Sequence, residues 1–132
     1  AEEYKCNKIA LGHHLDDLIE TYLLNQFFVG KTATMAPKLT SDCKKHQVVR
    51  PLVYVQEKDI IEFSSEWGFP IVCCQCPLAC GKNQTFDHKR QKMKNLLKNL
   101  ESDIPNIKSS LLTSMTNVKP SHLLDRDLWN FK

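Results

Sequence analysis

A dense group of histidines and carboxylates stands where a short apolar run gives way to an amphipathic stretch. The run covers residues 8–11, and the group that follows is Gly-His-His-Leu-Asp-Asp at residues 12–17. The apolar run predicts a buried strand. The stretch predicts a helix, because its apolar side chains recur at helical spacing, at Leu15, Leu18, Ile19, Tyr22, Leu23 and Phe27. Since α/β proteins bind nucleotides at such strand-to-helix junctions, the pattern predicts a site here.

Helix capping is the simplest alternative explanation for the acids of this group. Asp16 and Asp17 fall in the first helical turn, where the helix dipole favours negative charge by roughly 0.3–1 kcal/mol. Capping accounts for one carboxylate. It does not account for two carboxylates beside His13, His14 and Glu20. We therefore treat the whole group as a candidate site.

The rest of the chain alternates between strand and helix patterns. We expect strands at 8–12, 47–50 and 69–73, helices at 15–29, 56–67, 86–101 and 106–117, a polar loop at 31–46, and a tail without clear period at 118–132. Gly30 and Gly68 follow two of the helices, as helix-ending glycines do. This strand–helix alternation predicts an α/β fold with a parallel sheet and covering helices, followed by a helical C-terminal region.

Basic residues gather in one part of the chain, although the formal net charge is only +3. They are Lys82, Lys89, Arg90, Lys92, Lys94 and Lys98. On a helix with its apolar residues inward and its lysines outward, they predict a face for RNA. An ordinary solvated helix face is the alternative. No apolar run nears the roughly 20 residues that span a bilayer, so we expect no membrane partner.

Six cysteines could suggest a disulfide scaffold, but their placement does not favour one. Cys73, Cys74, Cys76 and Cys80 crowd together, and adjacent cysteines cannot easily bridge each other. Thiolate chemistry or metal ligation in a reducing, cytoplasmic setting fits better. A tetrahedral zinc site from Cys74, Cys76 and Cys80 is one alternative. We expect Cys73 and the isolated Cys6 and Cys43 to pack as small hydrophobic residues.

The motif at 12–21, Gly-His-His-x-Asp-Asp-x-x-Glu-Thr, resembles the PP-loop ATP pyrophosphatases that modify tRNA. Further segments are similar to the branch that makes 2-thiocytidine in tRNA. They are Asn25, Phe27, Gly30, Met-Ala-Pro-Lys-Leu at 35–39, Val-Arg-Pro-Leu at 49–52, Tyr54, Glu-Lys-Asp-Ile at 57–60, Asn-Val-Lys-Pro-Ser-His-Leu-Leu-Asp at 117–125, Leu128 and Phe131. The resemblance spans residues 8–131. It implies a Rossmann-like fold of the adenine nucleotide alpha-hydrolase type.

The resemblance implies that ATP adenylates a base carbonyl, releasing pyrophosphate, and that a nucleophile then displaces AMP. It implies catalytic roles for His13, Asp16 and Asp17, ATP binding by Gly12, His13, His14, Lys38 and Arg50, and Mg²⁺ on Asp17 or Asp16, since Mg²⁺ prefers carboxylate oxygens. Three alternatives stay open. His14 could be a core histidine, Arg50 could pair with Glu20, and Lys38 could simply face solvent.

An iron–sulfur cluster is also implied, because the thiocytidine branch carries a cysteine at the position of Cys74. There it joins an upstream Cys-x-x-Cys pair on a 4Fe-4S cluster, which leaves one iron open to hold sulfide. In the commoner pattern, two cysteines three apart precede Gly-Ser-Gln. This chain departs from that pattern, so Cys74 and Cys76 remain alternative ligands.

The family's phosphate-binding loop, Ser-Gly-Gly-x-Asp-Ser, does not occur in these 132 residues. We therefore interpret the chain as a C-terminal half, with residues 1–81 completing the nucleotide-binding domain and residues 82–132 forming a basic helical region. The expected partners are tRNA, an N-terminal half with the missing loop, a sulfur donor protein and, through an open sheet edge, a second copy in a homodimer. Alone, the chain should be inactive.

Two other functions remain open at this point. The lysidine-forming tRNA ligases share the motif at 12–21. They usually have Gln where this chain has Leu18 and Arg-Gly where it has Val29-Gly30, and they lack the cysteine group. A non-catalytic metal- or RNA-binding module is the third possibility, since the phosphate-binding loop does not occur here.

Overall fold

The computed structural model describes residues 1–70 and 84–124, with side chains from residue 88 onward in the second range. Its elements are β1 (Lys8–Ala10), α1 (Leu15–Leu24), the π-helical turn η1 (Asn25–Val29), β2 (Lys38–Thr40), β3 (Gln47–Val49), α2 (Glu57–Glu66), α4 (Gln84–Asp103), α5 (Ile107–Thr116) and the short 3-10 turn η2 (Pro120–His122). The expected strand at 69–73 is wrong at Phe69 and Pro70, which form no strand, and its remainder lies outside the described residues.

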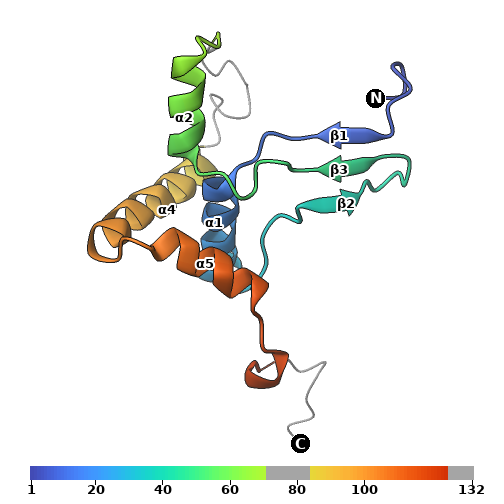
Figure 1. Ribbon diagram of the computed structural model, residues 1–132. Coiled ribbons are helices and arrows are strands. Elements are labelled where there is room, and N and C mark those ends of the chain that lie inside the picture. Colours follow the sequence, from blue (N-terminus) through green and yellow to red (C-terminus); the bar gives the residue numbers. More distant parts are fainter. Residues whose placement is uncertain (71–83, 125–132) are drawn as a thin grey trace, which may run out of the picture.

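The sheet has the strand order β1-β3-β2 and is mixed rather than parallel (Figure 1). β1 and β3 pair in parallel with Ile9 opposite Val48, which confirms the two strands expected there. β2 pairs antiparallel to β3, so the polar loop expected at 31–46 in fact contains a strand. Three residues, Lys-Leu-Thr, are too few to show a strand period. The hairpin turn supports them, because the Ser41 N–H donates to the His46 carbonyl (2.9 Å).

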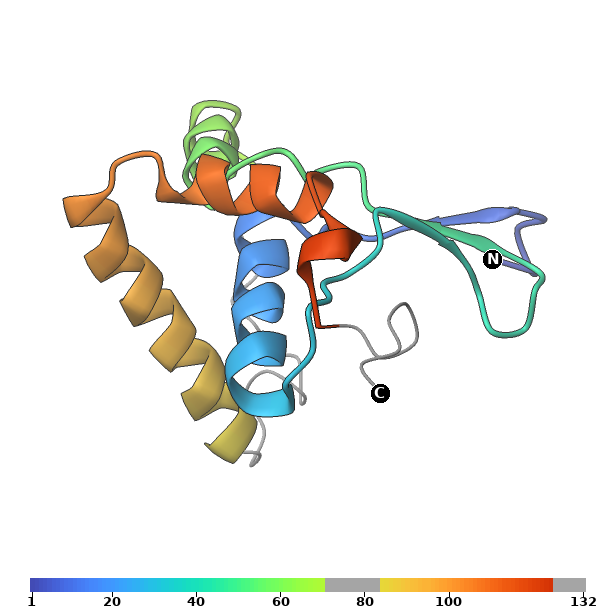
Figure 2. The same ribbon diagram turned by 90° about the horizontal axis from the view of Figure 1, so that it is seen from below.

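The sheet extends away from the helices, as Figures 1 and 2 show from two sides. All three residues of β1 are exposed, Ile9 by 37%, so the buried strand expected at 8–12 is wrong. The covering helices expected there instead pack mainly on one another, because their apolar faces meet in a separate cluster. This leaves β1 as an edge with one unpaired side among the described strands.

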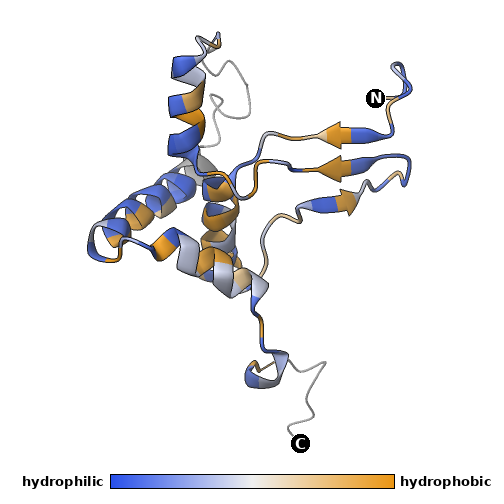
Figure 3. Ribbon diagram, in the orientation of Figure 1, coloured by the Kyte–Doolittle hydropathy of each residue, from blue (hydrophilic) through white to orange (hydrophobic). Residues whose placement is uncertain are grey.

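The core is a cluster of helices centred on α1, where Figure 3 shows hydrophobic residues concentrated. α4 and α5, the two helices expected at 86–101 and 106–117, pack against α1 and against each other. The buried members are Leu15, Ile19, Leu23, Leu24, Met93 and Leu97, with Tyr22, Leu96, Leu111, Leu112 and Met115 partly buried around them. The two regions that the sequence analysis separated between residues 81 and 82 therefore contribute to one hydrophobic core.

Two helices end where the sequence predicted. η1 extends α1 to Val29, and Gly30 follows with a φ of 73°, a left-handed conformation that favours glycine. Gly68 has a φ of 61° just beyond α2. Across the described ranges, no helix combines the length and the apolar character needed to cross a membrane.

Candidate nucleotide site

The segment that carries the histidines leaves β1 beside the segment that leaves β3. Two backbone hydrogen bonds hold them together, from the Leu11 N–H to the Val49 carbonyl and from the Leu15 N–H to the Val55 carbonyl, both 2.9 Å. Because β1 and β3 run in parallel, their carboxyl ends meet at one edge of the sheet. The structure therefore brings the 12–17 group next to Arg50, which directly follows β3.

Three buried nitrogen atoms at this edge have no hydrogen-bond partner in the described part of the chain. They are Nδ1 of His13, Nδ1 of His14 and Nε of Arg50. A buried polar group left unpaired costs about 1–3 kcal/mol, so such atoms favour a ligand that supplies acceptors. Arg50 is oriented by its own backbone surroundings, since its Nη1 donates to the Ala36 carbonyl. Phosphate oxygens are the acceptors that histidine and arginine side chains suit.

Asp17 lies at the N-terminus of α1 and connects several groups. Its Oδ2 accepts a hydrogen bond from the His14 backbone N–H (3.1 Å) and lies 3.3 Å from His14 Nε2. Its Oδ1 lies 3.2 Å from Arg90 Nη2 on α4. The contact to the His14 N–H is half of a capping box, so Asp17 fixes the start of the helix. Its side chain keeps 21% exposure, so a ligand can still reach it.

Asp16 is committed to contacts that hold helices together. It is buried, and its carboxylate accepts from the Glu57 N–H at the start of α2 (2.7 Å) and from Lys108 Nζ on α5 (2.8 Å). Burial raises the pKa of this carboxyl, but the bonds from Lys108 and Glu57 outweigh it, so the pKa lies below its ordinary value. These contacts describe a structural carboxylate, and they set Asp16 apart from the metal role that the resemblance allowed it.

Glu20 is the most buried charged residue of α1, at 2% exposure. Its Oε2 accepts from Arg90 Nε (2.8 Å), and its Oε1 lies 3.7 Å from Lys94 Nζ. Burial raises the pKa of Glu20 despite these cations. The alternative pairing of Glu20 with Arg50 is therefore wrong, because Arg90 takes that place.

The expectation that all basic residues of α4 face outward is wrong for Arg90 and Lys94, which turn toward α1. Sequence reasoning placed all the lysines outward and missed that two cations pair with the acids of α1. Their (i, i+4) spacing, facing the acidic first turns of α1, was the available signal. Lys89, Lys92 and Lys98 remain exposed.

Gly12 and Lys38 lie near the same edge. A Cβ atom at Gly12 would meet nothing within 4 Å, so the described part of the chain leaves space beside this residue. Lys38 is exposed at the start of β2, where its register partner is Val49, the residue before Arg50.

Comparison with known proteins gives close relatives for nearly the whole chain. A tRNA-cytidine(32) 2-sulfurtransferase of Citrifermentans bemidjiense is 58% identical over 97% of this chain, and one of Bdellovibrio bacteriovorus is 54% identical over 95%. Over nearly its whole length the chain is therefore similar to tRNA-cytidine(32) 2-sulfurtransferases, the branch that the motif at 12–21 resembles. It spans about half the length of these relatives, 49% and 46%. No protein-family model matches it.

A solved structure supports the fold of this chain. The U34-tRNA thiolase NcsA from Methanococcus maripaludis, solved with its [4Fe-4S] cluster, aligns with a TM-score of 0.61 at 21% identity. The match covers 89% of this chain and 39% of that one. The α/β fold class with a helical C-terminal region is thereby confirmed, and the detail to correct is the mixed sheet.

The cysteines expected to bind metal, Cys74, Cys76 and the alternative Cys80, lie outside the described residues. Cys6 and Cys43 are exposed, so their expected packing as small hydrophobic residues is wrong. Hydrogen bonds from Ser41, from the Lys45 backbone and from His46 lower the pKa of the Cys43 thiol to about 7. Among the described residues, no three His, Cys, Asp or Glu side chains are grouped to hold a metal ion.

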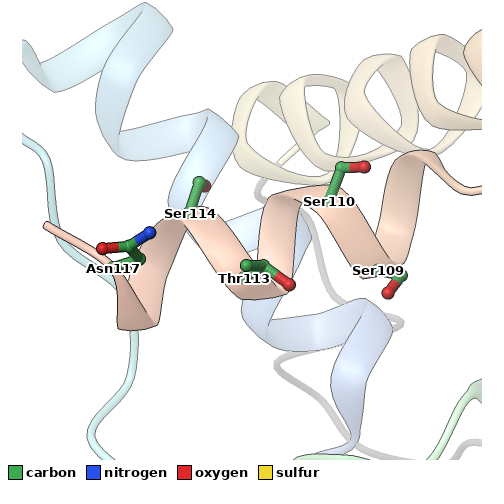
Figure 4. A pocket seen from close by; sticks show the side chains of 5 residues that line it. All are labelled: Ser109, Ser110, Thr113, Ser114 and Asn117. Atoms are coloured by element: carbon green, nitrogen blue, oxygen red, sulfur yellow. The ribbon is translucent and has the colours of Figure 1, made fainter.

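Among the hollows in the described part of the chain, two open on the helices. One of about 300 Å³ lies between α1, α2, α4 and α5 and is lined by the ion-paired residues, among them Asp16, Glu20, Lys94 and Lys108. The other, of about 460 Å³, runs along α5 (Figure 4) and is lined by Ser109, Ser110, Thr113, Ser114 and Asn117. Neither hollow includes the three unpaired nitrogens.

Proposed function

We propose that the full-length protein containing this chain is an ATP-dependent tRNA 2-sulfurtransferase that thiolates a cytidine, with cytidine 32 the first candidate. The single observation that carries the proposal is the set of buried nitrogens on His13, His14 and Arg50 at one sheet edge, which have no hydrogen-bond partner within residues 1–70 and 84–124. The names of relatives at 54–58% identity supply the substrate class. They favour thiolation over the lysidine-forming reaction.

In the proposed reaction, the cytosine carbonyl oxygen attacks the α-phosphorus of ATP and pyrophosphate leaves. A sulfur nucleophile then attacks the ring carbon that bears this oxygen, and AMP departs with the oxygen. His13, His14 and Arg50 would hold phosphate oxygens through their ring and guanidinium nitrogens, and the guanidinium of Arg50 would place positive charge where negative charge develops. Lys38 would add a further contact to ATP, and the open space beside Gly12 would leave room for the nucleotide.

A magnesium ion fits this site through one carboxylate only. Asp17 is partly exposed, and each carboxylate oxygen has two lone pairs, so both retain acceptor capacity. Mg²⁺ often keeps several waters and takes one or two carboxylates together with substrate phosphates. The ion would supply charge neutralisation on the phosphates. Asp17 would orient it, while Asp16 keeps its contacts to Lys108 and α2.

The free edge of β1 is where the rest of the enzyme would complete the sheet. Among the described strands, β1 pairs on one side with β3, and its other side offers the backbone groups of Lys8–Ala10. Unpaired strand edges pair readily with further strands. The relatives are about twice as long as this chain, so we propose that an N-terminal half carrying Ser-Gly-Gly-x-Asp-Ser pairs there. A homodimer through the same edge is the competing assembly.

The isolated chain should neither hydrolyse ATP nor thiolate tRNA, because it lacks the phosphate-binding loop. The full-length protein should release pyrophosphate from ATP when tRNA is added. Both can be measured in one coupled pyrophosphate assay at equal protein concentration. ATP turnover by the 132-residue chain would contradict the assignment of the loop to the upstream half. A full-length protein without tRNA-dependent release would contradict the proposed function.

We propose that tRNA contacts the exposed lysines of α4. Lys89, Lys92 and Lys98 are exposed, and Lys89 Nζ also lies 4.9 Å above the Phe28 ring. The boundary at residues 81 and 82 would then separate a nucleotide-binding part from an RNA-contacting part that share one hydrophobic core. The reaction fits a reducing, cytoplasmic setting, where thiols persist.

An iron–sulfur cluster is proposed to bind Cys74 or Cys76 together with an upstream cysteine pair, since the NcsA neighbour was solved with a [4Fe-4S] cluster. Such a cluster with one open iron could hold the sulfur that a donor protein delivers. Zinc is the alternative metal. The described residues contain no competing cluster ligands, because Cys6 and Cys43 stand apart from any metal-binding group.

Cys74→Ala or Cys76→Ala in the anaerobically purified full-length protein should abolish visible iron–sulfur absorbance and thiolation while ATP binding remains. Cys43→Ala is the matched control, because Cys43 is exposed on the β2–β3 hairpin and should leave the absorbance unchanged. An intact cluster in the Cys74→Ala/Cys76→Ala double variant would remove both cysteines from the site. Stoichiometric zinc with full activity would favour the zinc alternative.

A further inference from the structure

Arg90 on α4 contacts two carboxylates of α1 at once. Its Nε donates to Glu20 Oε2 at 2.8 Å, and its Nη2 donates to Asp17 Oδ1 at 3.2 Å. The guanidinium is planar and offers donors in a fixed fork, so binding one acid fixes where the other donors point. Glu20 is almost fully buried, which makes it a rigid anchor for that fork.

The second carboxylate continues the connection to the histidines. Asp17 accepts from Arg90 on Oδ1, and its Oδ2 accepts from the His14 N–H and lies 3.3 Å from His14 Nε2. The opposite ring nitrogen of His14, Nδ1, is one of the three buried nitrogens that have no hydrogen-bond partner among the described residues. It lies 3.9 Å from Asp16 Oδ2, too far for a hydrogen bond. The contacts thus run from Glu20 through Arg90 and Asp17 to His14.

We infer that Arg90 is a positioning residue, which orients Asp17 and His14 for the reaction without contacting ATP. The inference rests on the proposed function and extends it to a residue outside the 12–21 motif. Lysine cannot replace Arg90, because one ammonium group does not provide two donors in a fixed plane. The same contact joins the helix proposed to bind tRNA to the motif proposed to bind ATP.

A simple Arg90→Ala change would leave Glu20 buried without its closest cation and could unfold the protein. The test therefore compares two full-length variants, Glu20→Gln and Glu20→Gln/Arg90→Ala. The first keeps the contact of Arg90 to Asp17, and the second removes it without leaving a buried charge at position 20. Gln91→Ala is the matched control, because Gln91 is exposed on α4 and its side-chain hydrogen bond among the described residues goes to Asn95 of the same helix.

We expect the double variant to release pyrophosphate with a kcat about 10- to 100-fold below that of Glu20→Gln, the size of loss that small misplacements of reacting groups produce. The KM for ATP should change less than threefold, and the thermal midpoint should stay near that of Glu20→Gln. Guanidinium chloride at millimolar concentration should restore part of the kcat in the double variant but not alter the Gln91→Ala protein.

An unchanged kcat in the double variant would overturn the inference. A loss that guanidinium does not restore, together with a lowered thermal midpoint, would also overturn it, because Arg90 would then act on stability alone. The proposed function is tested separately, by pyrophosphate release from the wild-type protein. If the wild type releases pyrophosphate and the double variant matches Glu20→Gln, only the role of Arg90 fails.

Discussion

Replacing Asp17 with alanine in the full-length protein should slow tRNA-dependent pyrophosphate release by about 10²-fold or more, the usual cost of losing a preorganised charged group. Asp17 lies 3.3 Å from His14 Nε2 and accepts the His14 N–H, so the change removes both a ligand contact and the orientation of the histidine. Binding of tRNA, measured by filter retention, should be unaffected, because Asp17 lies on α1 and the exposed lysines proposed to contact tRNA lie on α4.

Asp16→Asn serves as the comparison for this prediction. It removes a neighbouring charge but keeps an acceptor for the Glu57 N–H, and we expect it to lower stability more than the rate of pyrophosphate release. Wild-type pyrophosphate release in Asp17→Ala would exclude Asp17 from the site. A larger loss of rate in Asp16→Asn than in Asp17→Ala would reverse the roles assigned to the two acids.

Lys108→Met should lower the free energy of unfolding of the full-length protein by about 3 kcal/mol near pH 7, because it leaves Asp16 as a buried charge without its cation. Lys108 Nζ lies 2.8 Å from Asp16 Oδ1, and both side chains are largely buried. Its second contact, to Glu101, is more exposed and contributes little. Urea unfolding would measure the difference. Lys92→Met, an exposed change on α4, should stay within about 0.5 kcal/mol of wild type.

The pH dependence of this loss distinguishes an unpaired charge from lost packing. In the wild type the pKa of Asp16 is lowered, so its contribution to stability is present above the unfolded pKa of about 4 and is lost as pH falls through the folded value. In Lys108→Met, burial should instead raise that pKa, and protonation at low pH should relieve the cost. The difference between the two proteins should therefore begin to shrink as pH falls from 7 toward about 4, where the variant takes up its proton, and should shrink further below 4 as the wild type loses its own stabilisation.

Asp16→Asn/Lys108→Met should be more stable than Lys108→Met alone at pH 7, because it removes the unpaired charge. A destabilisation of Lys108→Met that is constant from pH 7 to pH 4 would show that the methylene chain of Lys108, rather than its charge, stabilises the protein.

The helices could be predicted from the sequence because each one carries its own period. Leu15, Ile19 and Leu23 lie on one face of α1, and this face is buried as expected. Glycines at positions 30 and 68 marked helix ends correctly because their left-handed conformations are a local property of the backbone. The sequence around 12–17 likewise predicted the junction between β1 and α1, because the order of strand and helix is local information.

The partners of the acids could not be predicted in the same way. Arg90 and Lys94 reach Glu20 across roughly 70 residues of chain, and the sequence alone does not show which face of α4 turns toward α1. Lys108 was unremarkable in the sequence, yet it fixes Asp16. β2 was missed because three residues carry no period, and its pairing with β3 depends on the turn at 41–46.

The most direct test of the account is the nucleoside content of tRNA in a strain from which the full-length gene has been deleted. Digested tRNA from that strain, analysed by mass spectrometry, should lack 2-thiocytidine. The wild-type gene should restore the modified nucleoside, and the Asp17→Ala gene should not. If 2-thiocytidine persists in the deletion strain, or if Asp17→Ala restores it fully, the assigned reaction or the assigned site is wrong.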